Sequence, residues 1–176
     1  DAGLTLRMLK AALAQRGGRR DAAARTSNFL ALKEKRAYFS HPSTRSTAVP
    51  MHPQRLVQEV NDAVPDEAIV CSDAGNSRHW MNHFYQTRRA NSYFGSGGLG
   101  GVSWSLPATL TAKILFPERP AVGVCGDGGF AMQMHVLLSA LQYQVAPVYV
   151  IMNNSMLGMT SQSMGELITG CDFPDV

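Results

Sequence analysis

A single carboxylate lies among three glycines in the segment GDGGF, residues 126–130, where an apolar run ends and a helical pattern begins. Glycines leave backbone N–H groups uncovered and let a ligand approach the chain closely. The free N–H groups at a helix N-terminus favour phosphate. A carboxylate beside them would repel phosphate, so Asp127 fits this position if a cation lies between the two charges. The segment therefore predicts a metal-bridged phosphate site.

The other ligands of such a cation are expected after the next strand, where Asn154 follows Asp127 by 27 residues. One helix and one strand fill that separation, so a βαβ crossover would bring both side chains to one edge of a parallel sheet. Mg²⁺ prefers near-octahedral oxygen ligands. The Asp127 carboxylate, the Asn154 amide oxygen, a backbone carbonyl just past Asn154 and diphosphate oxygens provide them. The N–H groups of Gly128 and Gly129 are expected to hold the remaining phosphate oxygens.

The elements that position these residues follow Pro53, where helix and strand patterns begin to alternate. Apolar strands that alternate with helices favour an α/β fold, a doubly wound parallel sheet with helices on both faces. Ligands of such sheets bind beyond the C-terminal strand ends, where Asp73, Asp127 and the Asn153–Asn154 pair fall. We expect helices over 53–64, 76–86, 102–115 and 129–143 and strands over 68–73, 92–94, 120–127 and 147–154.

A basic leader precedes this region. Residues 3–15 have the apolar spacing of a helix, and residues 17–52 form an Arg-, Ala-, Ser- and Pro-rich connection with one short helix around 28–38. Residues 1–46 carry ten Lys or Arg and three Asp or Glu, a net charge of +7, whereas residues 47–176 carry six and ten, a net charge of −4. The basic excess is confined to the leader, which favours a solvated linker over a nucleic-acid-binding arm.

The composition, 45% hydrophobic and 16% charged over 176 residues, is typical of a soluble globular chain. No run reaches the roughly 18 apolar residues of a membrane span, and the N-terminus lacks the pattern of a signal peptide. The three cysteines lie far apart without a CxxC pair. This usage indicates a reducing, cytoplasmic setting and no zinc site.

The GDG motif followed at this spacing by NN resembles the cofactor signature of thiamine diphosphate (ThDP) enzymes. The resemblance covers about residues 50–170 and implies the ThDP-binding fold, with ThDP and Mg²⁺ as cofactors. The segments that are similar to the C-terminal diphosphate-binding (PP) domain of the acetolactate synthase and pyruvate oxidase branch are SDAGNSRHW, FGSGGLGGVSWSLPA, GDGGFAMQM and NNSMLGM.

The resemblance implies roles for single residues. The residues placed against the diphosphate are Asn76 and Ser77, which follow Gly75. The implied metal ligands are the side chains of Asp127 and Asn154 and the carbonyl of Met156. The Gly100 carbonyl is expected to accept a hydrogen bond from the 4′-amino group of the cofactor. Val102 would wedge the cofactor into its bent form, and Met159 would line the cofactor and substrate pocket.

The resemblance also implies a larger assembly. It identifies residues 1–16 as the tail of a preceding middle domain, 17–52 as a basic interdomain linker and 53–176 as a PP domain that is incomplete at its C-terminus. The family's activating glutamate belongs to the pyrimidine-binding domain of a neighbouring subunit, so no catalytic residue is assigned in this chain, which alone is expected to be inactive. A homodimer or homotetramer is expected, with no nucleic acid partner and no membrane span.

The implied activity is decarboxylation of a 2-oxo acid such as pyruvate and transfer of the C2 unit to a second 2-oxo acid, as in acetolactate synthase. Two positions depart from that pattern: Ser163 takes the place of a substrate-selecting Trp, and Val136 that of an acid. A pyruvate oxidase-type enzyme, with FAD on the middle domain, therefore stays open. So does a non-catalytic or split-enzyme ThDP-binding subunit.

Two other patterns compete with this interpretation. GSGGLG, residues 95–100, matches the GxGxxG of dinucleotide-binding folds, but Glu118 precedes the next strand instead of following it. His79 and His83 have a spacing that permits a shared metal on one helix, yet they lack the Glu of HExxH. Surface or interface histidines are therefore favoured, and His135 is assigned no role.

Overall fold

The computed structural model describes residues 1–17, 22–36 and 39–161. The chain divides into two compact units, Asp1–Tyr38 and Phe39–Val176. The first unit contains α1 (Ala2–Gln15) and α2 (Ala22–Arg36), neither of which buries a side chain. Helix α2 begins earlier than the short helix predicted around 28–38. Within the described ranges, no helix is long and apolar enough to cross a membrane.

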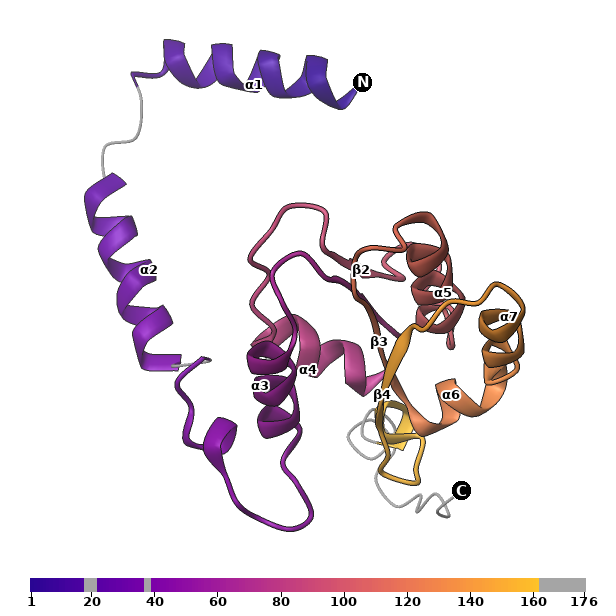
Figure 1. The fold of residues 1–176 in the computed structure, drawn as a ribbon. Coiled ribbons are helices and arrows are strands. Elements are labelled where there is room, and N and C mark those ends of the chain that lie inside the picture. Colours follow the sequence, from indigo (N-terminus) through magenta and orange to yellow (C-terminus); the bar gives the residue numbers. More distant parts are fainter. Residues whose placement is uncertain (18–21, 37–38, 162–176) are drawn as a thin grey trace. The chain divides into compact units, whose positions relative to one another are not determined.

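The second unit is built on a parallel sheet of four strands in the order β2-β1-β3-β4 (Figure 1). The strands are β1 (Ile69–Ser72), β2 (Tyr93–Gly95), β3 (Ala121–Gly126) and β4 (Val148–Met152). One row across the sheet joins Tyr93, Val70, Val122 and Val148. The central strands β1 and β3 are almost entirely buried, whereas the edge strand β4 is partly exposed. This pattern explains why the central strands read as unbroken apolar runs.

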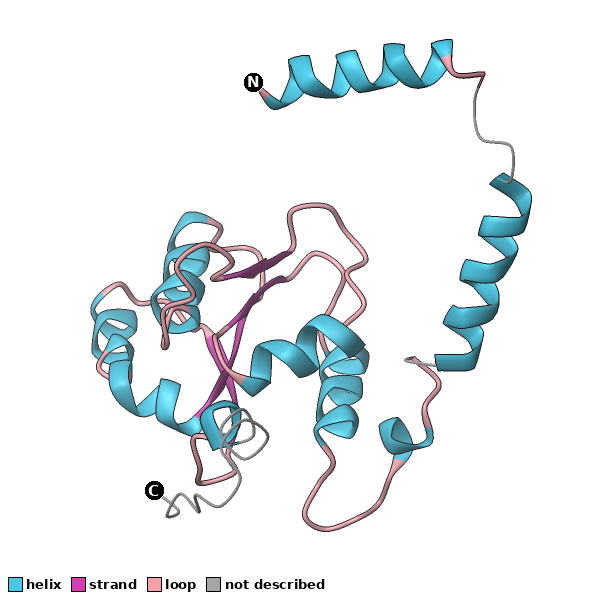
Figure 2. Cartoon of the chain, turned by 180° about the vertical axis from the view of Figure 1, so that it is seen from behind, coloured by secondary structure: helices cyan, strands magenta, loops and turns pink. Residues whose placement is uncertain are grey.

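Helices cover both faces of the sheet, as the cartoon in Figure 2 shows from behind. On one face, α3 (Pro53–Ala63) packs on α4 (Asn76–Phe84), and the 3₁₀ turn η1 (Pro42–Arg45) packs on α3. On the other, α5 (Ser105–Leu115) lies on β1 and β3 beside α6 (Asp127–Gln133) and α7 (Val136–Gln142). The predicted doubly wound α/β fold is confirmed.

Helix α5 approaches the sheet closely at a glycine in β3. A Cβ atom on Gly123 would lie 2.6 Å from Oγ1 of Thr109 and 2.8 Å from Cδ1 of Tyr149. The Tyr149 hydroxyl in β4 donates to the Leu106 carbonyl of α5 at 2.8 Å. The missing side chain of Gly123 thus leaves room for Thr109 of α5 and Tyr149 of β4 to pack against β3.

The single helix predicted over 129–143 is wrong, because α6 and α7 are separate helices. Between them, the N–H groups of Leu137 and Leu138 donate to the carbonyls of Met134 and His135, at 3.1 and 3.0 Å. Such i→i+3 bonds tighten the turn and interrupt the α-helical ladder. The predicted helix over 102–115 also begins later, at Ser105.

The strand order creates a switch point between β1 and β3. The chain leaves β1 towards β2 and leaves β3 towards β4, in opposite directions across the sheet. In open parallel sheets, ligands bind outside the C-terminal ends of two such strands. The segments that follow these ends are 73–76 and 127–129.

Candidate cofactor site

Asp127 joins the turn after β3 to the turn after β4. It is the first residue of α6, and its Oδ1 accepts from the Gly128 N–H at 2.9 Å. Its Oδ2 accepts from the Ser155 N–H at 2.8 Å. Ser155 has a φ of 54°, and its N–H also donates to Oδ1 of Asn153 at 3.1 Å. The structure therefore brings the GDG and NN segments into direct contact, as the crossover argument predicted.

Two asparagines, one from the segment after β1 and one from the segment after β4, converge at Gly158. Asn76 begins α4 after β1, and Asn154 follows β4. A Cβ atom on Gly158 would lie 2.9 Å from Nδ2 of each asparagine. Gly158 is buried, so the absence of a side chain there makes room for both amides. The turn before α4 needs Gly75, whose φ is 90°.

The other predicted cofactor residues lie around these contacts. Ser77 is buried, and its hydroxyl donates to the Ala74 carbonyl at 3.2 Å. Met159 is half-buried. The Met156 carbonyl accepts from the Gly158 N–H at 2.9 Å, which leaves a second lone pair of that oxygen for another partner.

The glycine-rich loop after β2 is anchored to α4. Nη1 of Arg78 donates to the Ser96 carbonyl at 3.1 Å. Further along the loop, Gly100 has a φ of 72°, and Val102 is 52% exposed. An exposed apolar side chain at this edge is available to contact a ligand. Since β2 is an edge strand and α5 begins only at Ser105, the geometry differs from the strand-to-helix turn of a dinucleotide site.

Sequence reasoning gave no role to Asp73, although it noted the acid at a strand end. Its carboxylate is fully buried and accepts backbone N–H groups of Ser103 and Ser105. Sequence reasoning also missed Gly158, for which the glycine directly after NNSML was the available signal. Ser103 and Ser155 have left-handed backbone conformations, which the residue type serine does not predict.

The donors at this edge suit a hard cation. Mg²⁺ is usually held by one or two carboxylates, carbonyl oxygens, water and substrate phosphates. Asp127, Asn154 and the Met156 carbonyl offer this chemistry. Among the residues that the structure describes, no three His, Cys, Asp or Glu side chains cluster as a metal site. Nδ1 of His83 hydrogen-bonds to the His79 carbonyl at 2.7 Å.

The cysteines below the site are poorly suited to nucleophilic chemistry. Burial raises the pKa of the Cys125 thiol to about 12, and the carboxylates of Asp73 and Asp127 act in the same direction. Burial also raises the pKa of Cys71, against a smaller opposite effect of a Thr109 hydrogen bond. Both thiols therefore stay protonated and unreactive near neutral pH.

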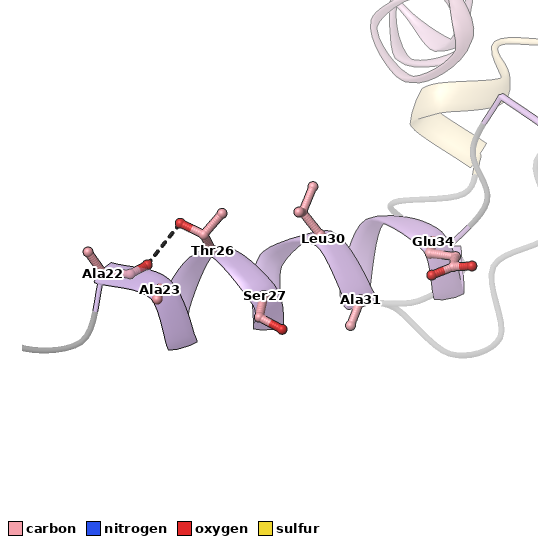
Figure 3. A pocket seen from close by; sticks show the side chains of 7 residues that line it. All are labelled: Ala22, Ala23, Thr26, Ser27, Leu30, Ala31 and Glu34. Carbon is pink, nitrogen blue, oxygen red and sulfur yellow. Dashed lines mark hydrogen bonds between the residues drawn. The ribbon is translucent and has the colours of Figure 1, made fainter.

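An open hollow along α2 is drawn in Figure 3. All of its lining residues belong to that one exposed helix: Ala22, Ala23, Thr26, Ser27, Leu30, Ala31 and Glu34. The Thr26 hydroxyl donates to the Ala22 carbonyl at 2.9 Å. One helix face does not enclose a ligand, and none of the predicted cofactor residues lines it.

Comparison with known proteins places this geometry in context. The family model described as "Thiamine pyrophosphate enzyme, C-terminal TPP binding domain" matches residues 73–170. A probable acetolactate synthase large subunit from Methanococcus aeolicus is 32% identical over 119 residues, which are 65% of this chain and 20% of the relative. A putative thiamine pyrophosphate-containing protein, YdaP, from Bacillus subtilis is 36% identical over 110 residues, 62% of this chain and 19% of the relative.

A solved structure has the same fold. The thiamine diphosphate-dependent 4-hydroxybenzoylformate decarboxylase of Rhodococcus jostii RHA1 superposes with a TM-score of 0.66 at 27% identity, over 74% of this chain and 24% of that one. The chain spans about a fifth of the length of the relatives that it matches.

Proposed function

Because this chain belongs to the thiamine pyrophosphate enzymes, as a C-terminal TPP-binding domain of the acetolactate synthase-like branch, we propose that it forms part of a ThDP- and Mg²⁺-dependent carboligase. The proposed enzyme decarboxylates a 2-oxo acid, pyruvate in the first instance, and transfers the C2 unit to a second 2-oxo acid. The observation that carries this proposal is the bond between the Asp127 carboxylate and the Ser155 N–H, which unites the two motif segments.

The residues proposed to hold the cofactor follow from their chemistry. Asp127 accepts one N–H on each carboxylate oxygen, so each oxygen keeps a lone pair for Mg²⁺. The amide oxygen of Asn154 and the Met156 carbonyl complete the protein ligands. Asn76 and Ser77, at the N-terminus of α4, are proposed to bind the diphosphate, which the helix dipole favours.

When bound, ThDP supplies the carbon centre that attacks the 2-oxo acid and lets CO₂ leave. This chain would position that cofactor. Val102, exposed in the loop before α5, would support the cofactor, the Gly100 carbonyl would accept from its amino group, and Met159 would line the pocket. Positioning of this kind supplies a large share of the rate of a bimolecular reaction.

A pyruvate oxidase-type enzyme is the second candidate. Ser163 stands where the acetolactate synthase pattern has a Trp, a position outside the described residues. An oxidase would pass the electrons to FAD on a middle domain instead of transferring the C2 unit. Val136, the other departure, is buried beside α5 and Cys125, so it fills the core.

The product assay separates the two candidates. The native protein is incubated with pyruvate, ThDP and Mg²⁺, with and without an electron acceptor. We expect acetolactate without an acceptor. Acetate formed only with an acceptor would instead establish the oxidase. Pyruvate consumed under neither condition, while ThDP binds, would refute pyruvate as the substrate and leave the family assignment standing.

We further propose a cytoplasmic homo-oligomer in which the pyrimidine-binding domain of a neighbouring subunit supplies the activating glutamate. Exposed apolar side chains on α6 and α7 and in the turn between them support an association: Met132, Met134, Leu137, Leu138 and Leu141. Light scattering after size exclusion tests it: a dimer or tetramer is expected, and a monomer at all concentrations would contradict it.

A further inference from the structure

The carboxylate of Asp73 is fully withdrawn from water. Asp73 follows β1, and its backbone N–H donates to the Val124 carbonyl of β3 at 2.8 Å, so the centre of the sheet fixes its place. A buried carboxylate needs hydrogen-bond donors to offset its lost hydration. The groups that surround Asp73 therefore have to be donors that the fold holds in place.

Those donors come from the segment that leads into α5. The Ser103 N–H donates to Oδ2 of Asp73 at 3.0 Å, and the Ser105 N–H donates to Oδ1 at 3.3 Å. Trp104, the residue before α5, makes no capping bond with its own side chain. Asp73 thus replaces a local cap, and the positive end of the helix dipole favours its charge.

The same carboxylate also touches α6. A Cβ atom on Gly129 would overlap Oδ2 of Asp73, so only glycine allows this approach. The Ser103 hydroxyl donates to the Gly129 carbonyl. Ser103 is fully buried with a φ of 69°, a conformation that non-glycine residues rarely adopt. Segments after β1, before α5 and at the start of α6 therefore meet at one side chain.

From this arrangement we propose that Asp73 is a positioning residue for the cofactor. It acts through Ser103 and Gly129 to fix the loop that carries Gly100 and Val102 against the first turn of α6. The inference rests on the proposed function, since both segments belong to the proposed ThDP site. Without the carboxylate, the loop and the turn would lose their common anchor, and ThDP would have to order them on binding.

Asp73→Asn tests this role. The substitution preserves shape but replaces one acceptor oxygen by an NH₂ group, which cannot accept from Ser103 or Ser105. ThDP binding with Mg²⁺ is measured calorimetrically on the native protein, at a temperature where circular dichroism shows the variant to be folded. We expect an affinity lower by at least about 10-fold. The control is Asp66→Asn, an exposed carboxylate paired with Arg88, which should bind like wild type.

Each outcome decides the matter. Unchanged affinity in folded Asp73→Asn protein overturns the positioning role and leaves the proposed function intact. A wild-type protein that does not bind ThDP overturns the proposed function, and this inference with it. If Asp73→Asn does not fold, the ThDP affinity of Ser103→Ala is measured instead. This variant keeps the backbone N–H that donates to Asp73 and loses only the hydroxyl that donates to the Gly129 carbonyl. Lower affinity then supports the inference and equal affinity overturns it.

A coupling measurement checks the geometry itself. Gly129→Ala should lower Tm in the wild-type background, because its methyl group overlaps the carboxylate. In an Asp73→Ala background that space is empty, so the same change should lower Tm much less. Equal losses in the two backgrounds would contradict the close approach on which the inference depends.

Discussion

Asp127 uses both carboxylate oxygens to hold the turns after β3 and β4 together. If Asp127 also binds Mg²⁺ as proposed, its removal would take away both a metal ligand and the contact that orders the neighbouring turn. We expect Asp127→Ala to lower Mg²⁺-dependent ThDP affinity by more than the roughly 10–100-fold that loss of an outer-shell partner costs. Calorimetric titration of the native protein with ThDP, in Mg²⁺ and in its absence, measures the change.

Asp127→Asn is the matched variant for this residue. Its amide oxygen can still accept from Ser155, so it removes the charge while it keeps one bond of the turn. The ThDP affinity of Asp127→Asn should lie between those of wild type and Asp127→Ala. Wild-type affinity in Asp127→Ala protein would show that Mg²⁺ is bound elsewhere.

Gly158 sets the positions of two asparagine amides. An alanine methyl group there would lie 2.9 Å from Nδ2 of both Asn76 and Asn154, so the ends of these side chains have to move. Residues 158–161 are helical, and alanine favours a helix over glycine, so we expect a change in Tm of less than about 2 °C. ThDP affinity should nevertheless fall by about 10-fold.

The double variant Asn76→Ala with Gly158→Ala identifies the cause of that loss. If the methyl group acts by displacing Asn76, it should add little once Asn76 is truncated. Fully additive losses would mean that Gly158 matters for another reason.

At the scale of single residues, the sequence predicted the proposed ligand residues and missed the buried residues that hold the neighbouring loops in place. Asp127 and Asn154 were predicted because their types and their separation both suit a metal at a strand edge, and the structure joins their segments. Ser103 was missed because its left-handed backbone depends on tertiary contacts, and a serine in the sequence does not indicate such a conformation. The metal and diphosphate roles themselves stay predictions until binding is measured.

Among the elements, the contact between α5 and the sheet depends on a missing side chain in β3. A methyl group on Gly123 would meet Thr109 and Tyr149, which are both held by hydrogen bonds to α5. Overpacking of this kind costs typically about 1–3 kcal/mol. We expect Gly123→Ala to lower Tm by roughly 3–10 °C.

Thermal unfolding followed by circular dichroism measures this effect. Gly98→Ala is the control, because nothing lies within 4 Å of its Cβ position and its φ is not positive. It should leave Tm almost unchanged. A tolerated Gly123→Ala would mean that α5 can shift away from the sheet.

The limits of the strands and of α3 and α4 were predicted to within two residues, whereas the start of α5 and the break between α6 and α7 were not. Each strand is bounded by proline, glycine or polar residues and carries an apolar run, so its ends differed by only a residue or two. The break between α6 and α7 has no such signal, because Met134 and His135 continue the helical pattern without proline or glycine. The start of α5 shifted because Ser103 bonds to Asp73, a contact across the fold.

For the molecule as a whole, we expect the buried thiol of Cys125 to lower the free energy of unfolding at alkaline pH. The pKa of Cys125 rises from 9.0 to about 12 in the folded state. Below pH 9.0 the thiol is protonated in both states, so its contribution is fully present. Between pH 9.0 and about 12 the unfolded chain loses the proton first, so the free energy of unfolding falls, by at most about 1.4 kcal/mol per pH unit.

Urea unfolding under reducing conditions, at about pH 8 and about pH 10.5, measures this loss. Cys125→Ala removes the titrating thiol, so its stability should fall less between the two pH values than that of wild type. Cys125 also helps to raise the pKa of Tyr149, so the difference includes that interaction, whereas groups that do not interact with Cys125 cancel. Identical losses would mean that Cys125 titrates alike in the folded and unfolded chains.

The neighbouring placement of β1 and β3 has a kinetic consequence. Ile69 pairs with Ala121, although β2, α4 and α5 all lie between them in the chain. The centre of the sheet therefore closes only after a long loop has been ordered, and such distant pairings make folding slow. The ends of β1 and β3 meet only at that step. During synthesis, the proposed cofactor edge cannot form until the chain has grown past β3, and until then β1 can pair only with β2.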